Sequence, residues 1–276
     1  MIYSSAKLNG GLGNQMFQLS HAYVQAWEAQ RKGINVQAQF INYADVAQFT
    51  NRQVFHYQSN ILQNINFKPF TETEKKIDNW ISLKEKDFSY NELTPTWNKS
   101  ILFEGYYQSD KYFKDYENNI RELFQITPHF ENLFIKKYEQ LKSNTTCIQI
   151  RRGDYLNTPD FHPVITENYL RDAIEHNKSQ NPEHYLVITD DYNWAREILP
   201  KYININKLIF GEESDWVQMW LGSLCSHFIS SNSTFGWWIA FLSRNKNKQI
   251  IFPEKWFGPR GPQNWTDVYI KDSIVL

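Results

Sequence analysis

Two adjacent arginines at the end of a short apolar segment are the residues of this chain best suited to bind an anion. Arg151 and Arg152 follow the apolar residues 146–150 and precede Gly153 and Asp154. An arginine fork matches phosphate oxygens in pairs and never loses its charge. Gly153 permits a sharp turn, so Asp154 can fold back onto an arginine and fix its orientation. The pattern predicts an anion clamp; a surface salt bridge at a strand end is the alternative.

A run of small polar residues, 230–234, joins an apolar segment to residues with helical spacing. Backbone N–H groups at a helix start bind phosphate, and the hydroxyls of Ser233 and Thr234 would complete such a seat. Ordinary N-capping, which needs only one of these residues, is the alternative.

Three glycines, Gly10, Gly11 and Gly13, follow the apolar residues 2–8 and precede a segment with helical apolar spacing. Residues 34–40 then return to a strand pattern. A strand, a glycine loop, a helix and a second strand predict a parallel sheet with a ligand at the loop. A plain tight turn is the alternative.

The helix of this unit is expected to have Asn14 as its N-cap and Gly33 as its C-cap. Met16 stands where a dinucleotide-binding loop would have its third glycine, which disfavours that kind of site. We expect the loop backbone to approach a bound sugar nucleotide instead.

The second half of the chain alternates between strand and helix patterns, which predicts a doubly wound parallel sheet. Ligands bind beyond the carboxyl ends of such strands, where Arg151, Asp190 and Ser231 are expected to lie. The first half is less regular, with a helix expected near residues 71–84. The expected strands of the second half are 147–150, 185–188, 207–210, 227–230 and 249–252, and the expected helices are 167–177, 192–199, 215–225 and 235–242.

Composition narrows the class of protein. The chain has 276 residues and a net charge of -1, so it lacks the basic excess of nucleic-acid-binding proteins. Cys147 and Cys225 both lie in apolar runs and suggest a reducing compartment without disulfides. The start of the chain does not read as a signal peptide, and no apolar run has transmembrane length. We therefore expect a cytoplasmic protein, with peripheral contact to the inner face of the cytoplasmic membrane left open.

No Asp-x-Asp pair occurs in the chain, and no histidine pair has metal-ligand spacing. Asp190 and Asp191 are adjacent, a pattern that favours a capping and turn role over a metal site. We therefore expect no metal and no cofactor, with the arginines and a helix dipole neutralising a diphosphate leaving group.

Four blocks of the sequence, residues 10–18, 105–113, 150–155 and 232–238, together resemble the bacterial α-1,2-fucosyltransferases. They occur in the order of that family and span nearly the whole chain. The resemblance implies an α/β protein of the GT-B type with two facing Rossmann-like lobes. The lobes would be residues 1–143, with the glycine loop and the acceptor side, and residues 144–276, which bind the donor nucleotide and whose tail returns to the first lobe.

The resemblance also implies a reaction, the metal-independent and inverting transfer of L-fucose from GDP-fucose. The acceptor would be the 2-hydroxyl of a terminal galactose-type sugar on an oligosaccharide, free or lipid-linked, as in O-antigen or capsule synthesis. The alternatives are a different GDP-sugar donor, a non-catalytic sugar-binding protein and a nucleotide-dependent oxidoreductase.

Some residue roles follow by position within the matching blocks, and Asp190 is added because it is expected at the end of a strand. Arg151 resembles the arginine that holds the β-phosphate, and Asp154 and Asn14 complete the expected catalytic set. Arg152 would brace the loop or reach the second phosphate. The expected donor-binding residues are Gly11, Gly13, Gln149, Arg152, Asp190, Asn232, Ser233 and Thr234.

Two positions depart from the family pattern. Gln149 stands where the family has a histidine that helps to read guanine, and Gln218 stands where it often has an aspartate. A glutamine still offers a donor and an acceptor, so base reading would be altered. The general base is not evident from the sequence, and its candidates are Asp154, Glu104, Asp110 and Asp190.

Overall fold

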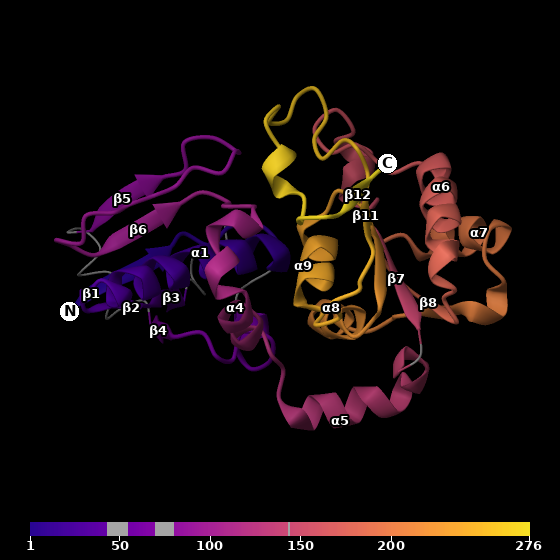
Figure 1. Ribbon diagram of the computed structural model, residues 1–276, viewed down its shortest axis with the longest axis horizontal. Coiled ribbons are helices and arrows are strands. Elements are labelled where there is room, and N and C mark those ends of the chain that lie inside the picture. Colours follow the sequence, from indigo (N-terminus) through magenta and orange to yellow (C-terminus); the bar gives the residue numbers. More distant parts are fainter. Residues whose placement is uncertain (43–54, 70–79, 143) are drawn as a thin grey trace. The chain divides into compact units, whose positions relative to one another are not determined.

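The computed structural model describes residues 1–42, 55–69, 80–142 and 144–276. The chain forms two compact units (Figure 1). Unit 1 is Met1–Thr127 with Thr266–Val268, and unit 2 is Pro128–Trp265 with Tyr269–Leu276. The division lies before the boundary expected at residues 143/144, because helix α5 (Pro128–Lys137) packs within unit 2. Its Phe130 ring lies 5.0 Å from that of Trp216.

Unit 1 contains a four-stranded parallel sheet in the order β2-β1-β6-β5. The predicted strand–loop–helix–strand unit is confirmed, since β1 pairs in parallel with β2 across the connecting helix α1. Two short helices and a separate parallel pair, β3 with β4, complete the described part. The bounds are β1 Ile2–Ala6, α1 Leu12–Arg31, β2 Val36–Ala38, β3 Phe40–Asn42, α2 Phe55–Gln58, β4 Phe67–Pro69, β5 Ile81–Lys84, β6 Ile101–Glu104 and α4 Glu117–Leu123.

Two expectations about unit 1 are wrong. The strand expected over 34–40 divides into β2 and the start of β3, which belong to different sheets. The helix expected near 71–84 fails at its end, because residues 81–84 form β5 and pair with β6. Its residues 71–79 lie outside the described part of the chain. In both places the strand partner is distant in sequence, so local spacing could not reveal it.

The two ends of α1 differ in how well they were predicted. The helix has Gly11 as its extended N-cap, so Asn14 lies in the first turn and its prediction as N-cap is wrong. The Gln15 side chain donates to the Gly10 carbonyl at 2.9 Å, which fixes the loop before the helix. At the other end Lys32 is the C-cap, and Gly33, predicted as the C-cap, is the residue after it, with a φ of +79°.

Unit 2 contains a six-stranded, all-parallel sheet in the order β12-β11-β10-β7-β8-β9. The doubly wound prediction is confirmed. The chain runs outward from β7 to β9 and then returns to build the other side from β10. The strands are β7 Thr145–Ile150, β8 His184–Thr189, β9 Leu208–Phe210, β10 His227–Ser230, β11 Ile250–Phe252 and β12 Ile274–Val275, and the further helices are α6 Glu167–Asn177, α7 Tyr192–Ile198, α8 Asp215–Ser223 and α9 Thr234–Leu242.

The core of unit 2 is built on the central strands. Ile148 of β7, Val187 of β8 and Ile229 of β10 are fully buried. Trp237 and Trp238 of α9 are buried as well, so they belong to the core. Among the described residues, no helix combines the length and apolar character needed to cross a membrane.

Candidate functional site

Arg151 and Ser231 meet at the point where the strand order of the unit 2 sheet reverses. Arg151 follows β7, Ser231 follows the neighbouring strand β10, and the Arg151 N–H donates to Ser231 Oγ at 2.8 Å. Ser231 Oγ in turn donates to the carbonyl of Gln149 at 3.1 Å. Chains leaving adjacent strands at such a reversal diverge and leave a crevice for a ligand. The two predicted anion-binding loops therefore lie together at the ligand edge.

The Arg151 guanidinium is held by two carboxylates. Its Nη2 lies 2.7 Å from Asp154 Oδ1, which confirms that Asp154 folds back onto an arginine. Its Nη1 lies 2.9 Å from Asp190 Oδ2, and the side chain is 27% exposed. A guanidinium has five N–H donors, so the fork is oriented while keeping capacity for a further acceptor. Two ion pairs therefore orient the Arg151 guanidinium, and its binding of an anion stays a prediction.

Asp190 connects several parts of this loop. Its Oδ1 accepts the backbone N–H of Arg152 at 2.8 Å while its Oδ2 pairs with Arg151. A side chain at Gly153 could not fit here, because a Cβ there would lie 2.7 Å from Asp190 Oδ2. Asp190 therefore positions the arginine loop from the end of the neighbouring strand β8.

Arg152 has the bracing role of the two that the sequence left open. Its Nε lies 3.1 Å from Asp191 Oδ2, and its Nη1 donates to the Ile165 carbonyl at 3.2 Å. Its Cζ also lies 3.9 Å from the ring centroid of Trp194. Asp191 Oδ1 accepts the Trp194 N–H at 3.2 Å and caps α7, so its predicted capping role is confirmed.

The polar run after β10 is largely engaged in internal bonds. Ser233 Oγ accepts the Phe235 N–H at 3.3 Å and caps α9. Asn232 is buried, and its Nδ2 donates to the Trp256 carbonyl at 3.0 Å. Thr234, the first residue of α9, is partly exposed. The phosphate seat stays a prediction, and Thr234 is its most exposed residue.

Gln149 lies in the interior, below the start of α9. Its Oε1 accepts the Ser230 hydroxyl at 3.4 Å, and a Cβ at Gly236 would lie 2.6 Å from the same oxygen. Gln218 is also engaged, because its Nε2 donates to the Glu213 carbonyl at 2.7 Å. The role of Gln149 in reading guanine stays a prediction. The buried position of its side chain does not add support for that role.

In unit 1 the glycine loop follows β1 and contacts the loop after β6. Asn14 Oδ1 accepts Gln108 Nε2 at 3.0 Å. Gly10 must be a glycine, since it has a φ of +79° and a Cβ there would lie 2.4 Å from Asn14 Nδ2. A Cβ at Gly11 would meet nothing within 4 Å, so a ligand can approach this backbone. Gly13 is buried in the first turn of α1.

Two titratable residues near these loops were missed in the sequence. Glu85 follows β5, and its two oxygens accept the N–H groups of Tyr106 and Tyr107 at 2.7 and 2.9 Å. Burial raises the pKa of Glu85 to about 7, although these two bonds lower it. In the sequence, Glu85 could have been found only as an acidic residue at the end of a strand. Because a helix was expected there, that signal was not recognised.

The second missed residue is His162, which lies near the arginine loop of unit 2. Its ring stacks on Tyr155 with 4.4 Å between centroids, and burial lowers its pKa, so it is neutral near pH 7. The histidines of this sequence are scattered, and no spacing pattern marks this one.

The four candidates for a general base differ in their contacts. Asp154 and Asp190 are paired with Arg151. Glu104 lies 3.3 Å from Lys7 Nζ, and its hydrogen bond from Ser82 lowers its pKa, which weakens it as a base. Asp110 begins a short 3₁₀ turn, Asp110–Tyr112. No group of three or more potential metal ligands occurs among the residues described.

Comparison with known proteins gives a family. The model of "Glycosyl transferase family 11" matches residues 3–261. An alpha-1,2-colitosyltransferase of Escherichia coli is 29% identical, over 91% of each chain. The O-antigen biosynthesis glycosyltransferase WbnK of Escherichia coli is 28% identical, over 91% of this chain and 93% of its own. A galactoside 2-alpha-L-fucosyltransferase of Caenorhabditis elegans is 29% identical over 54% of this chain and 45% of its own.

Solved structures with the same fold include two fucosyltransferases. POFUT1 in complex with GDP-fucose has a TM-score of 0.55 at 11% identity, over 91% of this chain and 97% of its own. NodZ alpha-1,6-fucosyltransferase co-crystallised with GDP has a TM-score of 0.52 at 13% identity, over 87% and 91%. The predicted α/β fold of the GT-B class is confirmed.

Proposed function

The chain belongs to glycosyl transferase family 11, and we propose that it transfers L-fucose from GDP-fucose to the 2-hydroxyl of a terminal galactose-type sugar. The observation that supports this best is the orientation of Arg151 by Asp154 and Asp190 at the strand-order reversal. A fixed guanidinium there suits the diphosphate of a nucleotide sugar. Gly11, Gly13 and Asn14 would lie on the donor side of unit 1.

The proposed reaction is a single displacement with inversion. The acceptor oxygen forms a bond to the anomeric carbon while the bond from that carbon to the phosphate oxygen breaks, and the electron pair leaves with GDP. The proton of the acceptor hydroxyl passes to a base, for which the candidates are Asp154, Glu104, Asp110 and Asp190. Negative charge grows on the departing phosphate, so a cation already in place stabilises the transition state more than the ground state. Arg151 would supply this charge, and on that basis we propose a metal-independent reaction.

A second donor deserves equal testing because of one relative. A protein 29% identical over 91% of this chain is an alpha-1,2-colitosyltransferase. We therefore keep GDP-colitose as the second candidate donor. Since another relative is an O-antigen biosynthesis glycosyltransferase, the proposed acceptor is an oligosaccharide of surface polysaccharide synthesis, free or lipid-linked. Such a role would place the protein in the cytoplasm or at the inner face of its membrane.

A donor screen tests this proposal. Thermal shifts are measured with GDP-fucose, GDP-colitose, GDP-mannose, GDP and NAD, and product formation is followed with a galactoside acceptor with and without EDTA. We expect stabilisation by GDP and GDP-fucose, none by NAD, and full turnover in EDTA. Strict metal dependence would overturn the metal-free mechanism, and glycan binding without affinity for GDP would indicate a non-catalytic sugar-binding protein.

A further inference from the structure

We propose that Tyr106 is a platform for a neutral sugar of the acceptor, with the Asn9 amide beside it as a hydrogen-bonding group. This rests on the proposed function, because it assigns a subsite of the same reaction. Tyr106 is 37% exposed, whereas the next residue, Tyr107, is fully buried. Neighbouring tyrosines with opposite environments mark a turn that presents one ring to a ligand.

The backbone of Tyr106 is held in place from two sides. Its N–H donates to Glu85 Oε2 at 2.7 Å, and the carbonyl of Gly105 accepts Gln18 Nε2 at 3.0 Å. Gly105 leaves no room for a side chain, since a Cβ there would lie 2.4 Å from Glu85 Cβ. An aromatic ring on so constrained a backbone loses little freedom when it binds, which favours affinity.

The residue after the platform holds an unusual conformation. Tyr107 has a φ of +53°, which is rare for a bulky side chain. Its ring stacks on His21 with 3.8 Å between centroids and an interplanar angle of 1°. The N–H of Tyr107 also donates to Glu85 at 2.9 Å. Strain of this kind persists where the surroundings impose it, and it clusters at ligand sites.

The platform lies at the ligand edge of the unit 1 sheet. Asn9 follows β1, Tyr106 follows the adjacent strand β6, and Asn9 Nδ2 donates to the Tyr106 hydroxyl at 3.3 Å. Both residues are exposed. Parallel sheets bind ligands beyond the carboxyl ends of their strands, so these two side chains stand where a substrate is expected.

The chemistry of this pair fits a neutral sugar. A tyrosine ring has a flat apolar face and a polar tip, which complements the C–H face of a hexose and its hydroxyls. The Asn9 amide can both donate to and accept from sugar hydroxyls. Lys7, a nearby cation, is exposed and pairs with Glu104 at 3.3 Å. A neutral ring with an amide suits the acceptor glycan better than the charged donor diphosphate.

Steady-state kinetics on Tyr106 variants test the platform. We expect Tyr106→Ala to raise the KM for the acceptor by about tenfold, the scale of one aromatic contact, while the KM for GDP-fucose and the thermal shift with GDP stay unchanged. Tyr106→Phe and Tyr106→Trp keep the ring and should stay within about threefold of wild type. Asn9→Ala, at an exposed position, should raise the acceptor KM in the same direction by a smaller factor.

Two results would overturn the platform. One is an unchanged acceptor KM in Tyr106→Ala, and the other is an equal rise in the KM of donor and acceptor. If Tyr106→Ala fails to fold, Asn9→Ala decides, and an unchanged acceptor KM in that variant would overturn the platform. Failure of the proposed function looks different, because then the wild-type protein itself shows no stabilisation by GDP-fucose.

Discussion

Nη1 of Arg151 lies 2.9 Å from Oδ2 of Asp190, an ion pair that joins the ends of the adjacent strands β7 and β8. The other oxygen of the same carboxylate accepts the N–H of Arg152, and Gly153 leaves the space that this contact needs. The orientation of the proposed phosphate-binding arginine is therefore set from a neighbouring strand. Both kcat and the free energy of unfolding should therefore depend on the residues of this ion pair.

Replacing Arg151 should affect turnover far more than folding. Arg151→Ala is expected to lower kcat by on the order of 10²–10³, as for loss of one donor to a developing oxyanion. Arg151→Lys should not restore it, because the planar fork is lost. Arg171→Ala is the matched control, since Arg171 is half-exposed and pairs only with its neighbour Asp172 among the ion pairs of the described residues. A lysine variant with near-normal kcat would exclude the clamp.

The two carboxylates on Arg151 should differ in their effect on stability. The Asp190 side chain is 25% exposed and accepts from two residues, so Asp190→Asn is expected to cost about 1–3 kcal/mol in the free energy of unfolding. Asp154 is 66% exposed, so Asp154→Asn should cost no more than about 1 kcal/mol. Urea denaturation of both variants measures the difference. Equal costs would show that Asp190 does not organise the loop.

Gly236 should resist any side chain. A Cβ there would lie 2.0 Å from Ser230 Oγ and 2.6 Å from Gln149 Oε1, so Gly236→Ala is expected to destabilise the protein by about 1–3 kcal/mol. Adding Ser230→Ala removes the nearer atom, and the double variant should lose less than the two single losses together. Denaturant unfolding of the four proteins measures this coupling; strict additivity would contradict the close contact.

Stability should fall with rising pH through Glu85. Burial raises the pKa of Glu85 from 4.5 to about 7, so between these values the folded chain binds more protons than the unfolded chain. Its contribution is therefore greatest below about pH 4.5 and declines as the pH rises to about 7. The free energy of unfolding, measured at pH 5 and pH 8, should fall more for the wild type than for Glu85→Gln. Identical pH dependence would refute this assignment.

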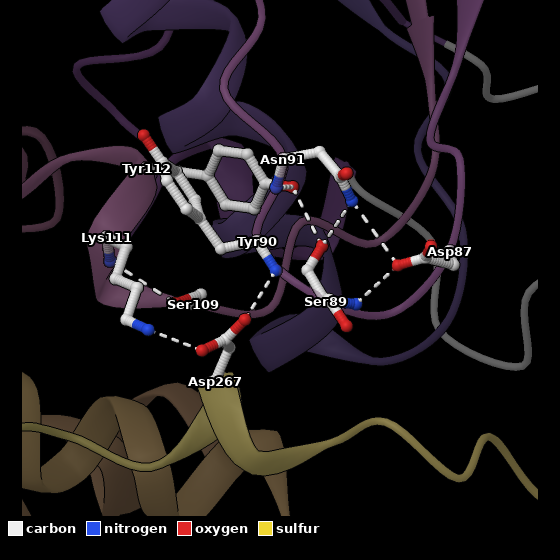
Figure 2. A network of polar contacts seen from close by, with 8 residues as sticks. All are labelled: Asp87, Ser89, Tyr90, Asn91, Ser109, Lys111, Tyr112 and Asp267. Atoms are coloured by element: carbon white, nitrogen blue, oxygen red, sulfur yellow. Dashed lines mark hydrogen bonds and ion pairs between the residues drawn. The ribbon is translucent and has the colours of Figure 1, made fainter.

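Asp267 should control the local stability of the segment around Tyr90 in unit 1. It accepts the N–H of Tyr90 at 2.8 Å and pairs with Lys111, as Figure 2 shows. Asp267→Asn weakens both contacts, so the Tyr90 amide should exchange with deuterium faster. The Tyr169 amide, which donates to the Thr166 hydroxyl at the start of α6, serves as the unaffected reference. Unchanged exchange at Tyr90 would mean that the bond adds no protection.

Local features of both units were predictable where they depend on neighbours in the sequence. Helix α6 runs over Glu167–Asn177, as expected, because its apolar spacing and the Thr166 cap are local signals. β12 was missed, since two residues carry no period and pair with β11 only in the folded chain. The N-cap of α1 was misplaced at Asn14 because the Gln15 side chain fixes the preceding loop.

From the residues alone it could be predicted that an arginine pair ends a buried parallel strand and that Asp154, three residues on, can reach Arg151. These are short-range relations, set by alternation and by a glycine turn. That Asp190 shares Arg151 and that Glu85 holds the Tyr106 turn became visible in the folded chain, because those partners follow other strands. Which strands become neighbours depends on how the whole sheet buries its apolar faces, and no local pattern contains that information.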